Sequence, residues 1–274
     1  MASSVVAYLY PCLTLPELPE VETVVRTLAP WLVGQRVERA EFPAPLVLRG
    51  APPPPLAART VESVTRKGKH IVIEMDRGCL VIHLGMTGKL LRGTEPTPYT
   101  RARLWLSDGE LLYDDVRQFG RILWSEGAPE QLAKLGPDPL LLASDDFARM
   151  VRARCGRIKP LLLDQRFLSG LGNIYTDEAL FLARIHPLTP ANRLSRARAV
   201  ELHRAIVEVL AASIESGGSS ISDYVDAEGR RGSYQQFHKV YGREGEPCPR
   251  CGRAIRRIVV AQRGTHFCPR CQRP

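Results

Sequence analysis

Four cysteines near one end of the chain constrain its fold more than any other feature. Cys248 and Cys251 form one C-x-x-C pair, and Cys268 and Cys271 form a second pair after 16 intervening residues. Each pair predicts a tight turn that directs two thiolates to one point, and four thiolates fit tetrahedral zinc. Surface disulfides or unliganded thiols are the alternative. Because sulfur fills all four positions, we predict one structural Zn²⁺, which stabilises a β-hairpin too small to have its own core.

The remaining cysteines and the N-terminal residues indicate a reducing compartment. Cys12, Cys79 and Cys155 occur singly, as small buried apolar residues do. The apolar run 5–10 is shorter than a signal-peptide core, and no run approaches the ~20 apolar residues of a spanning helix. We therefore expect a cytoplasmic, nucleoid-associated protein without a membrane segment.

The charge distribution suggests a polyanionic partner. The 274 residues include 38 Lys and Arg against 29 Asp and Glu, a formal net charge of +9. Residues 241–274 hold eight Arg and two Glu, so 8 − 2 = +6 of that charge lies in this segment. Clustered cations gain affinity for phosphates by releasing counterions. Arg263, beside Gly264 at the predicted hairpin tip, is our candidate DNA contact, with a solvated basic face as the alternative.

Hydrophobic periodicity divides the chain into a β-rich part and a helical part. Residues 16–34 predict a helix, because Pro19 suits its first turn, one apolar face continues through it and Gly34 suits its end. From 36 to 125, short apolar runs separated by turn residues predict an antiparallel sandwich. These runs are 60–64, 71–75, 80–83, 104–106, 111–113 and 122–124.

After the proline-rich segment 136–139, the pattern becomes helical. Candidate helices lie near 144–154, 159–167, 173–183 and 190–215, and the Gly- and Ser-rich segment 217–233 predicts a mobile loop. The fold class is α+β. The expected domains are a β-sandwich with an N-terminal helix over 16–136, a helical domain over 137–233 and the zinc finger over 240–274.

Two further motifs have both a functional and a structural interpretation. Gly170 and Gly172 precede Asn173 at a predicted helix start, where backbone N–H groups bind anions, and Lys159 could add a phosphate contact. A plain helix-turn-helix connection is the alternative. Residues 16–22, Pro-Glu-Leu-Pro-Glu-Val-Glu, are by themselves an ordinary helix start with acids in the first turn.

Taken together, the motifs resemble those of bacterial formamidopyrimidine-DNA glycosylases, in order and spacing, across residues 16–273. The motifs are Pro16-Glu17-Leu-Pro-Glu20-Val-Glu, Lys69 after Arg66-Lys67-Gly68, His83-Leu-Gly-Met86-Thr-Gly, Asp115-Val-Arg117-Gln-Phe119-Gly, Gly170-Leu-Gly-Asn173 and the zinc finger. The resemblance implies a helix-two-turn-helix in the helical domain. It also implies a monomeric base-excision repair enzyme for duplex DNA containing 8-oxoguanine or formamidopyrimidines, with abasic-site lyase activity.

The resemblance implies roles for four catalytic residues. Pro16 matches the N-terminal proline whose secondary amine attacks the sugar C1′, expels the base and forms an iminium, from which β and δ eliminations follow. Glu17 matches the general acid and base. Glu20 matches a supporting carboxylate, and Lys69 matches a lysine beside the damaged nucleotide's phosphate.

Other residues match the family's DNA-contacting groups. Met86, Arg117 and Phe119 match the side chains that fill the space left by the flipped nucleotide, which favours this branch over the endonuclease VIII branch. Residues 217–225 match the loop that closes over the flipped base, with Ser219 and Tyr224 as candidates. Core positions for Met86 and Phe119 and a flexible linker for the loop are the alternatives.

The chain departs from the family pattern ahead of Pro16. While Leu15 is joined to it, the Pro16 nitrogen belongs to an amide and has no free lone pair. We expect residues 1–15 to be an extension absent from the native protein, with Leu15 at the position of the family's initiator. If the extension is retained, a catalytically silent lesion-binding protein is expected. Two rival hypotheses are an endonuclease VIII-like enzyme for oxidised pyrimidines and a zinc-ribbon DNA-binding regulator.

Overall fold

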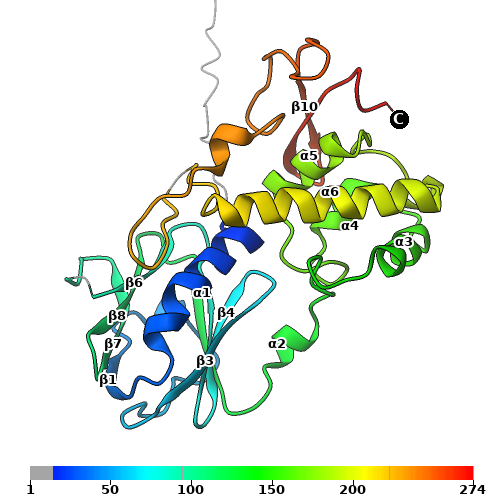
Figure 1. Cartoon of the computed structure of the whole chain (residues 1–274). Helices are drawn as coiled ribbons and strands as arrows, with labels where there is room; N and C mark the ends of the chain where they lie inside the picture. Colours follow the sequence, from blue (N-terminus) through cyan, green and yellow to red (C-terminus); the bar gives the residue numbers. More distant parts are fainter. Residues whose placement is uncertain (1–14, 94, 222, 274) are drawn as a thin grey trace, which may run out of the picture.

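The computed structural model describes residues 15–93, 95–221 and 223–273. A β-sandwich lies below a group of helices, and the zinc-finger hairpin lies above them (Figure 1). The expected α+β class is confirmed. None of the helices among the described residues has the length and apolarity needed to cross a membrane.

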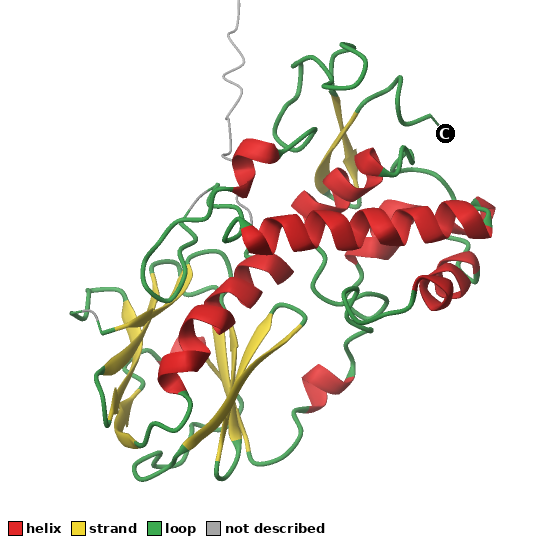
Figure 2. Cartoon of the chain, viewed as in Figure 1, coloured by secondary structure: helices red, strands yellow, loops and turns green. Residues whose placement is uncertain are grey.

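The sandwich consists of a four-stranded and a five-stranded sheet around one apolar core (Figure 2). All strand pairs in it are antiparallel except the short β2–β9 pair. The four-stranded sheet contains β1 (Val37–Glu41), β7 (Thr100–Leu106), β8 (Glu110–Asp115) and β6 (Gly88–Arg92). The five-stranded sheet contains β2 (Leu48–Arg49), β9 (Arg121–Ser125), β5 (Cys79–His83), β4 (His70–Met75) and β3 (Val61–Lys67).

Helix α1 (Leu18–Leu32) connects the sandwich with the helical part. Glu17 is its N-cap, and Glu17 and Glu20 form a capping box in which the Glu17 backbone N–H donates to Glu20 at 2.8 Å. Leu18 packs in the core of the helical part, whereas Val21 and Val24 pack in the sandwich core. The two carboxylates are thereby held at the junction of the two parts.

The helical part contains four longer elements around its own core. They are α3 (Ser144–Arg152), α4 (Ile158–Leu163), α5 (Asn173–Leu182) and α6 (Arg196–Glu215), and the single-turn α2 (Glu130–Ala133) precedes them. The described part of the chain also contains three 3₁₀ segments: Pro45–Val47, Ala191–Arg193 and Tyr234–Phe237. Strands β10 (Arg256–Val260) and β11 (Arg263–Phe267) form the zinc-finger hairpin.

Two predicted helix boundaries are wrong. In addition, the short apolar runs of the sequence do not predict strands β1, β2 and β6. The last long helix begins at Arg196, because the Ser195 hydroxyl accepts from the Arg198 N–H as its N-cap. The helix predicted over 159–167 ends at Leu163. Strand β1 has only one buried residue, β2 has only two residues, and β6 follows directly on a loop. None of the three therefore shows the apolar alternation that the prediction requires.

Candidate active site

A cavity of 370 Å³ lies where the start of α1, the sandwich, the α4–α5 connection and the zinc-finger hairpin meet. Leu15 and Glu17, on either side of Pro16, both line it, and Pro16 itself is buried. The lining residues are Leu15, Glu17, Lys69, His83, Leu163, Gln165, Leu171, Gly172, Asn173, Tyr241, Gln262, Arg263 and Gly264. The structure thus brings predicted site residues into one cavity, from segments distant in the sequence.

Glu17 is held by the N-terminal end of α5. Its buried carboxylate accepts from the Ile174 N–H at 3.0 Å and lies 3.5 Å from the Tyr175 nitrogen. The predicted anion site at this helix start is therefore occupied by a carboxylate of the protein itself. Burial raises the pKa of Glu17, while Lys69 and the backbone donors oppose the shift. A carboxyl with a raised pKa can act as a proton donor nearer neutral pH.

Gly172 allows Glu17 and Lys69 to approach the α5 start. A Cβ atom at this position would lie 2.3 Å from the Glu17 Cδ and 2.5 Å from the Lys69 Nζ. The other motif glycine, Gly170, has a φ of +92°, in the left-handed region that glycine adopts without strain. Close packing and backbone conformation around the cavity therefore require glycine at these two positions.

Lys69 reaches the cavity from the β3–β4 turn. The two strands pair as far as Lys67 with His70, and Gly68 has a φ of +58° in the turn between them. Burial lowers the pKa of Lys69, and the negative charges of Glu17 and Glu20 oppose this shift. A cation is thereby placed beside Glu17 in a partly desolvated site.

Glu20 lies at the centre of a buried network that connects α1, α5 and the 217–225 loop. Its carboxylate accepts from the Ser219 N–H at 2.7 Å and from the Tyr175 hydroxyl. Desolvation is the largest cause that raises the pKa of Glu20 to about 7, and the neighbouring Glu17 adds to it. Tyr175 also lies 2.7 Å from the Ser213 Oγ. Tyr175 closely follows the Gly-Leu-Gly-Asn motif, but no sequence pattern indicates its contact with Glu20.

Ser219 and Tyr224, the two candidates in the loop, both contact the start of α1. The Ser219 N–H is directed to Glu20, and the Tyr224 hydroxyl donates to the Glu20 backbone carbonyl at 3.2 Å. Both side chains are buried. A contact of either residue with a flipped base remains a prediction, and their observed contacts tie this loop to Glu20 at the start of α1.

Met86, Arg117 and Phe119 lie on two adjoining loops of the sandwich. The Arg117 guanidinium carbon lies 4.7 Å from the Phe119 ring centroid, and Phe119 is 45% exposed. The two loops are joined because the Thr87 hydroxyl donates to Asp115 and accepts from the Arg117 N–H at 3.2 Å. Buried Asp115, which the sequence does not single out as a site residue, also accepts from the Gly120 N–H at 2.8 Å.

The predicted phosphate contact of Lys159 is wrong in this structure. Its side chain is 0% exposed, and its Nζ lies 2.6 Å from Asp177 Oδ1, so it has no surface to offer DNA. Asp177 also accepts from the His266 N–H at 2.8 Å. The buried pair therefore fixes the zinc-finger hairpin on α4 and α5.

Arg263 and Asn173 remain candidates for contact with DNA. Arg263 is exposed at the hairpin tip and lines the cavity. The Asn173 Nδ2 donates to the Gly264 carbonyl at 3.0 Å, so the hairpin tip is held against the start of α5. Within the described residues, the buried Asn173 Oδ1 has no hydrogen-bond partner.

Replacing Lys159 by Met is expected to reduce the free energy of unfolding by about 3–5 kcal/mol, because Asp177 would keep an uncompensated charge in the core. The matched control is Lys134→Met, since Lys134 forms an exposed i,i+4 pair with Glu130. Its loss should cost less than about 1 kcal/mol. Urea unfolding of both variants checks this, and equal small losses would show that the buried pair contributes no more than the exposed one.

The four cysteines of the zinc finger converge on one point. Their Sγ atoms all lie within 4.8 Å of one another, with Cys251–Cys268 at 3.5 Å and Cys248–Cys271 at 3.9 Å. A tetrahedron with Zn–S bonds of about 2.3 Å requires sulfur atoms about 3.8 Å apart. The donor set and its spacing therefore fit one structural zinc ion.

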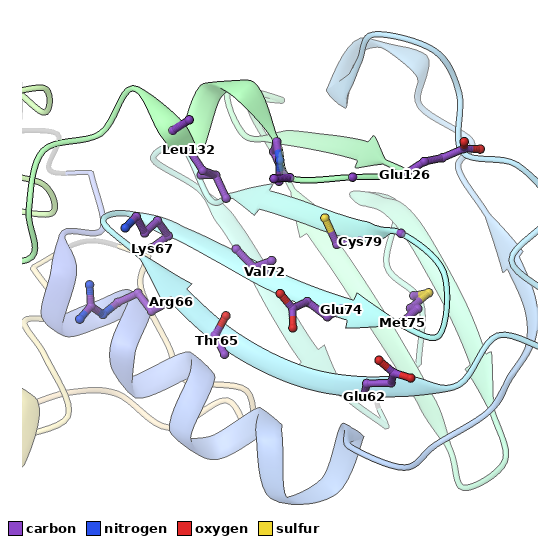
Figure 3. Close-up of a pocket in the computed structure, with 15 residues that line it drawn as sticks. Glu62, Thr65, Arg66, Lys67, Val72, Glu74, Met75, Cys79, Glu126 and Leu132 are labelled. Atoms are coloured by element: carbon purple, nitrogen blue, oxygen red, sulfur yellow. The ribbon is translucent and has the colours of Figure 1, made fainter.

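A larger hollow, of 620 Å³, lies on the face of the five-stranded sheet that points away from the sandwich core. Figure 3 shows Val72 and Cys79 on its floor and Leu132 opposite them. None of the residues that the sequence predicts for catalysis lines this hollow. The smaller cavity around Glu17 is therefore the candidate active site.

Comparison with known proteins identifies relatives over nearly the whole chain. Three family models match: the formamidopyrimidine-DNA glycosylase N-terminal domain over residues 15–122, the H2TH domain of the same enzymes over 135–225, and a zinc finger found in FPG and IleRS over 245–274. A formamidopyrimidine-DNA glycosylase of Solibacter usitatus is 54% identical over 94% of this chain and 100% of its own length.

Solved structures agree with these matches. A crystal structure of the Thermus thermophilus enzyme superposes with a TM-score of 0.85, at 45% identity over 94% of this chain and 98% of that chain. The Lactococcus lactis enzyme bound to DNA containing an abasic site has a TM-score of 0.84, at 37% identity over 94% of this chain and 100% of that chain.

Proposed function

The chain belongs to the formamidopyrimidine-DNA glycosylase family, and from this premise we propose that Pro16, Glu17 and Lys69 carry out its chemistry on oxidised purines in duplex DNA. It is a base-excision repair enzyme, a DNA glycosylase with abasic-site lyase activity. The observation that carries the residue assignment is the buried Glu17 carboxylate, held by α5 next to Pro16 in a cavity that also contains Lys69.

The proposed reaction begins with the Pro16 nitrogen as a free secondary amine. An N-terminal amine has a reference pKa of about 7.7–8.0, so a fraction is neutral near pH 7. The nitrogen lone pair forms a bond to C1′, the bond from C1′ to the base breaks, and the base leaves with that electron pair. The Pro16 nitrogen loses its N–H proton, which the departing base takes up, and Glu17 donates a proton to the ring oxygen as the sugar opens, which gives the iminium at C1′.

The iminium then withdraws electrons from the sugar. Loss of a proton from C2′ expels the 3′ phosphate, and a second elimination expels the 5′ phosphate, which leaves a one-nucleotide gap. Glu17, ionised after the first step, is the group placed to receive a proton. Lys69 would pair with a phosphate of the damaged nucleotide, and Glu20 would hold Glu17 and the 217–225 loop in place through its contacts with both.

The DNA is proposed to lie between the sandwich and the helical part. Met86, Arg117 and Phe119 would fill the space left by the flipped nucleotide, with Arg117 bonded to the orphaned base. Asn173 and Arg263 would contact phosphates on the helical side. All these groups come from one chain, which supports the expected monomer. Duplex DNA as the substrate supports a location with the chromosome in the bacterial cytoplasm.

Excision of 8-oxoguanine opposite cytosine is expected to exceed excision of thymine glycol by at least about tenfold in kcat/KM, equivalent to about 1.4 kcal/mol of transition-state binding. Single-turnover assays on the two duplexes measure this, with protein that begins at Pro16. A preference for thymine glycol would instead support an endonuclease VIII-like enzyme. Binding of both duplexes without strand cleavage would support a silent lesion-binding protein.

A further inference from the structure

The zinc-binding turns and the residues that follow α5 line a positively charged hollow of 520 Å³, separate from the candidate active site. Arg250 and Arg270 are the third residues of the two C-x-x-C turns, and Arg184 follows the last turn of α5. We name this site the arginine hollow, lined by Arg184, Arg250, Arg270 and Arg273 together with Cys251 and Cys271.

The arginine hollow carries an excess of positive charge. Among the residues that the structure describes, its lining contains four arginines and no carboxylate. All four are exposed, and in the part of the chain that the structure describes none of them forms an ion pair. A zinc ion bound by four thiolates has a net negative charge smaller than the charge of these four arginines. The site is therefore built to attract an anion from solution.

The position of Arg250 in the arginine hollow is fixed before any ligand binds. Arg250 donates from Nη1 to the Phe181 carbonyl at 2.8 Å and from Nη2 to the Leu182 carbonyl at 3.1 Å. Its guanidinium carbon also lies 4.6 Å from the Phe181 ring centroid. Arg270 is carried by the other cysteine turn. Because little side-chain freedom remains to be lost at Arg250, binding of an anion there costs less entropy.

The arginine hollow and the catalytic cavity lie at opposite ends of the same elements. Helix α5 has 10 residues and spans about 15 Å. Its first turn binds Glu17, whereas its last carbonyls bind Arg250. The zinc-finger hairpin also connects the two sites, because Arg263 at its tip lines the cavity and the cysteine turns at its other end line the arginine hollow. The two sites are therefore separated by about the length of α5 and share no lining residue.

We propose that the arginine hollow binds the phosphate backbone of a second duplex DNA segment while the first occupies the catalytic cavity. The proposal rests on the proposed function, which supplies the first segment. Guanidinium groups match phosphate oxygens in a bidentate manner. Protein–protein interfaces are commonly anchored by aromatic as well as arginine side chains, and the lining of this hollow contains arginine and cysteine but no aromatic residue. Binding two segments at once would let the enzyme transfer directly between them.

The test measures how a competitor affects release of the first duplex. Zinc-loaded protein beginning at Pro16 is bound to a labelled short duplex carrying a tetrahydrofuran abasic analogue, then mixed with unlabelled undamaged duplex. Direct transfer predicts that the dissociation rate rises at least about threefold as competitor increases from roughly 1 to 100 µM, the range of non-specific affinities. Arg184→Glu with Arg270→Glu should make the rate independent of competitor.

The control variant also replaces two arginines by glutamate, but on the sandwich. Arg49→Glu with Arg77→Glu changes two exposed arginines outside both sites and should keep the competitor dependence. Zinc content and circular dichroism establish that each double variant is folded. The proposal would be overturned if the dissociation rate of the unaltered protein did not depend on competitor concentration. It would also be overturned if the Arg184 and Arg270 variant kept the same dependence as the unaltered protein.

Two more outcomes would also contradict a second DNA site. If the Arg184 and Arg270 variant bound the first duplex more weakly even without competitor, the arginine hollow would contact the same duplex as the cavity. Acceleration by poly-glutamate but not by duplex would identify an acidic protein as the occupant. Borohydride trapping on a single damaged duplex tests the proposed function separately, because it does not require the arginine hollow.

Discussion

Protein that begins with a free Pro16 amine is expected to cleave abasic-site DNA, whereas protein that retains residues 1–15 is expected to be slower by about 10⁴-fold or more, the scale of loss when a covalent nucleophile is removed. The reason is electronic. In a Leu15–Pro16 peptide bond, the nitrogen lone pair is delocalised into the carbonyl and cannot attack C1′. Glu17 and Lys69 would keep their positions, so the difference isolates the amine.

Strand cleavage of an abasic duplex under single-turnover conditions measures the two rates. Binding of the tetrahydrofuran analogue by both forms is the control, because it reports whether the extension blocks the cavity sterically. Cleavage by the extended form at a comparable rate, with its mass verified after the assay, would exclude Pro16 as the nucleophile.

Replacing Glu17 by Gln is expected to lower the excision rate by about 10²–10⁴-fold, the usual contribution of a positioned acid or base. Gln keeps an oxygen that can accept from the Ile174 N–H but cannot deliver a proton. Because burial raises the pKa of Glu17, the acid form persists toward neutral pH, and the wild-type rate should fall as rising pH removes this proton. That alkaline limb should be absent from the pH–rate profile of the variant.

Glu22→Gln provides the matched control on the same helix. Glu22 pairs with Arg66 at 2.7 Å and with Arg26 at 2.8 Å, and it does not line the cavity. Its replacement should leave the excision rate nearly unchanged. If the two variants were equally impaired, the effect of Glu17→Gln would have to be ascribed to damage of α1, and the role of Glu17 as an acid would be refuted.

The sequence predicts most elements whose signal is local. The α1 helix and the runs that form β3, β4, β5, β7, β8 and β9 are all identifiable from apolar spacing and turn residues. The cysteine spacing predicts the convergence of four sulfur atoms. In the helix and the strands, nearby residues carry the signal for the backbone conformation, and in the zinc finger the C-x-x-C spacing carries the signal for each pair of ligands.

What the sequence could not predict depends on contacts between distant segments. Lys159 has the features of a surface phosphate ligand, and only the fold reveals that Asp177 pairs with it in the core. The sequence marks the start of α5 as an anion site, yet the group that the structure places there is the carboxylate of Glu17, which is 157 positions away from Ile174 in the sequence. Tyr175 and Asp115 likewise gain their roles only through tertiary contacts.

Borohydride trapping on an 8-oxoguanine:cytosine duplex, followed by mass analysis of the digested adduct, tests the identity of the nucleophile most directly. Borohydride reduces an iminium to a permanent bond between protein and DNA, so the modified residue marks the amine that attacked C1′. With protein that begins at Pro16, we predict a single adduct on the N-terminal proline. An adduct on Lys69, the lysine that also lines the cavity, or no adduct with folded, zinc-loaded protein, would contradict the account.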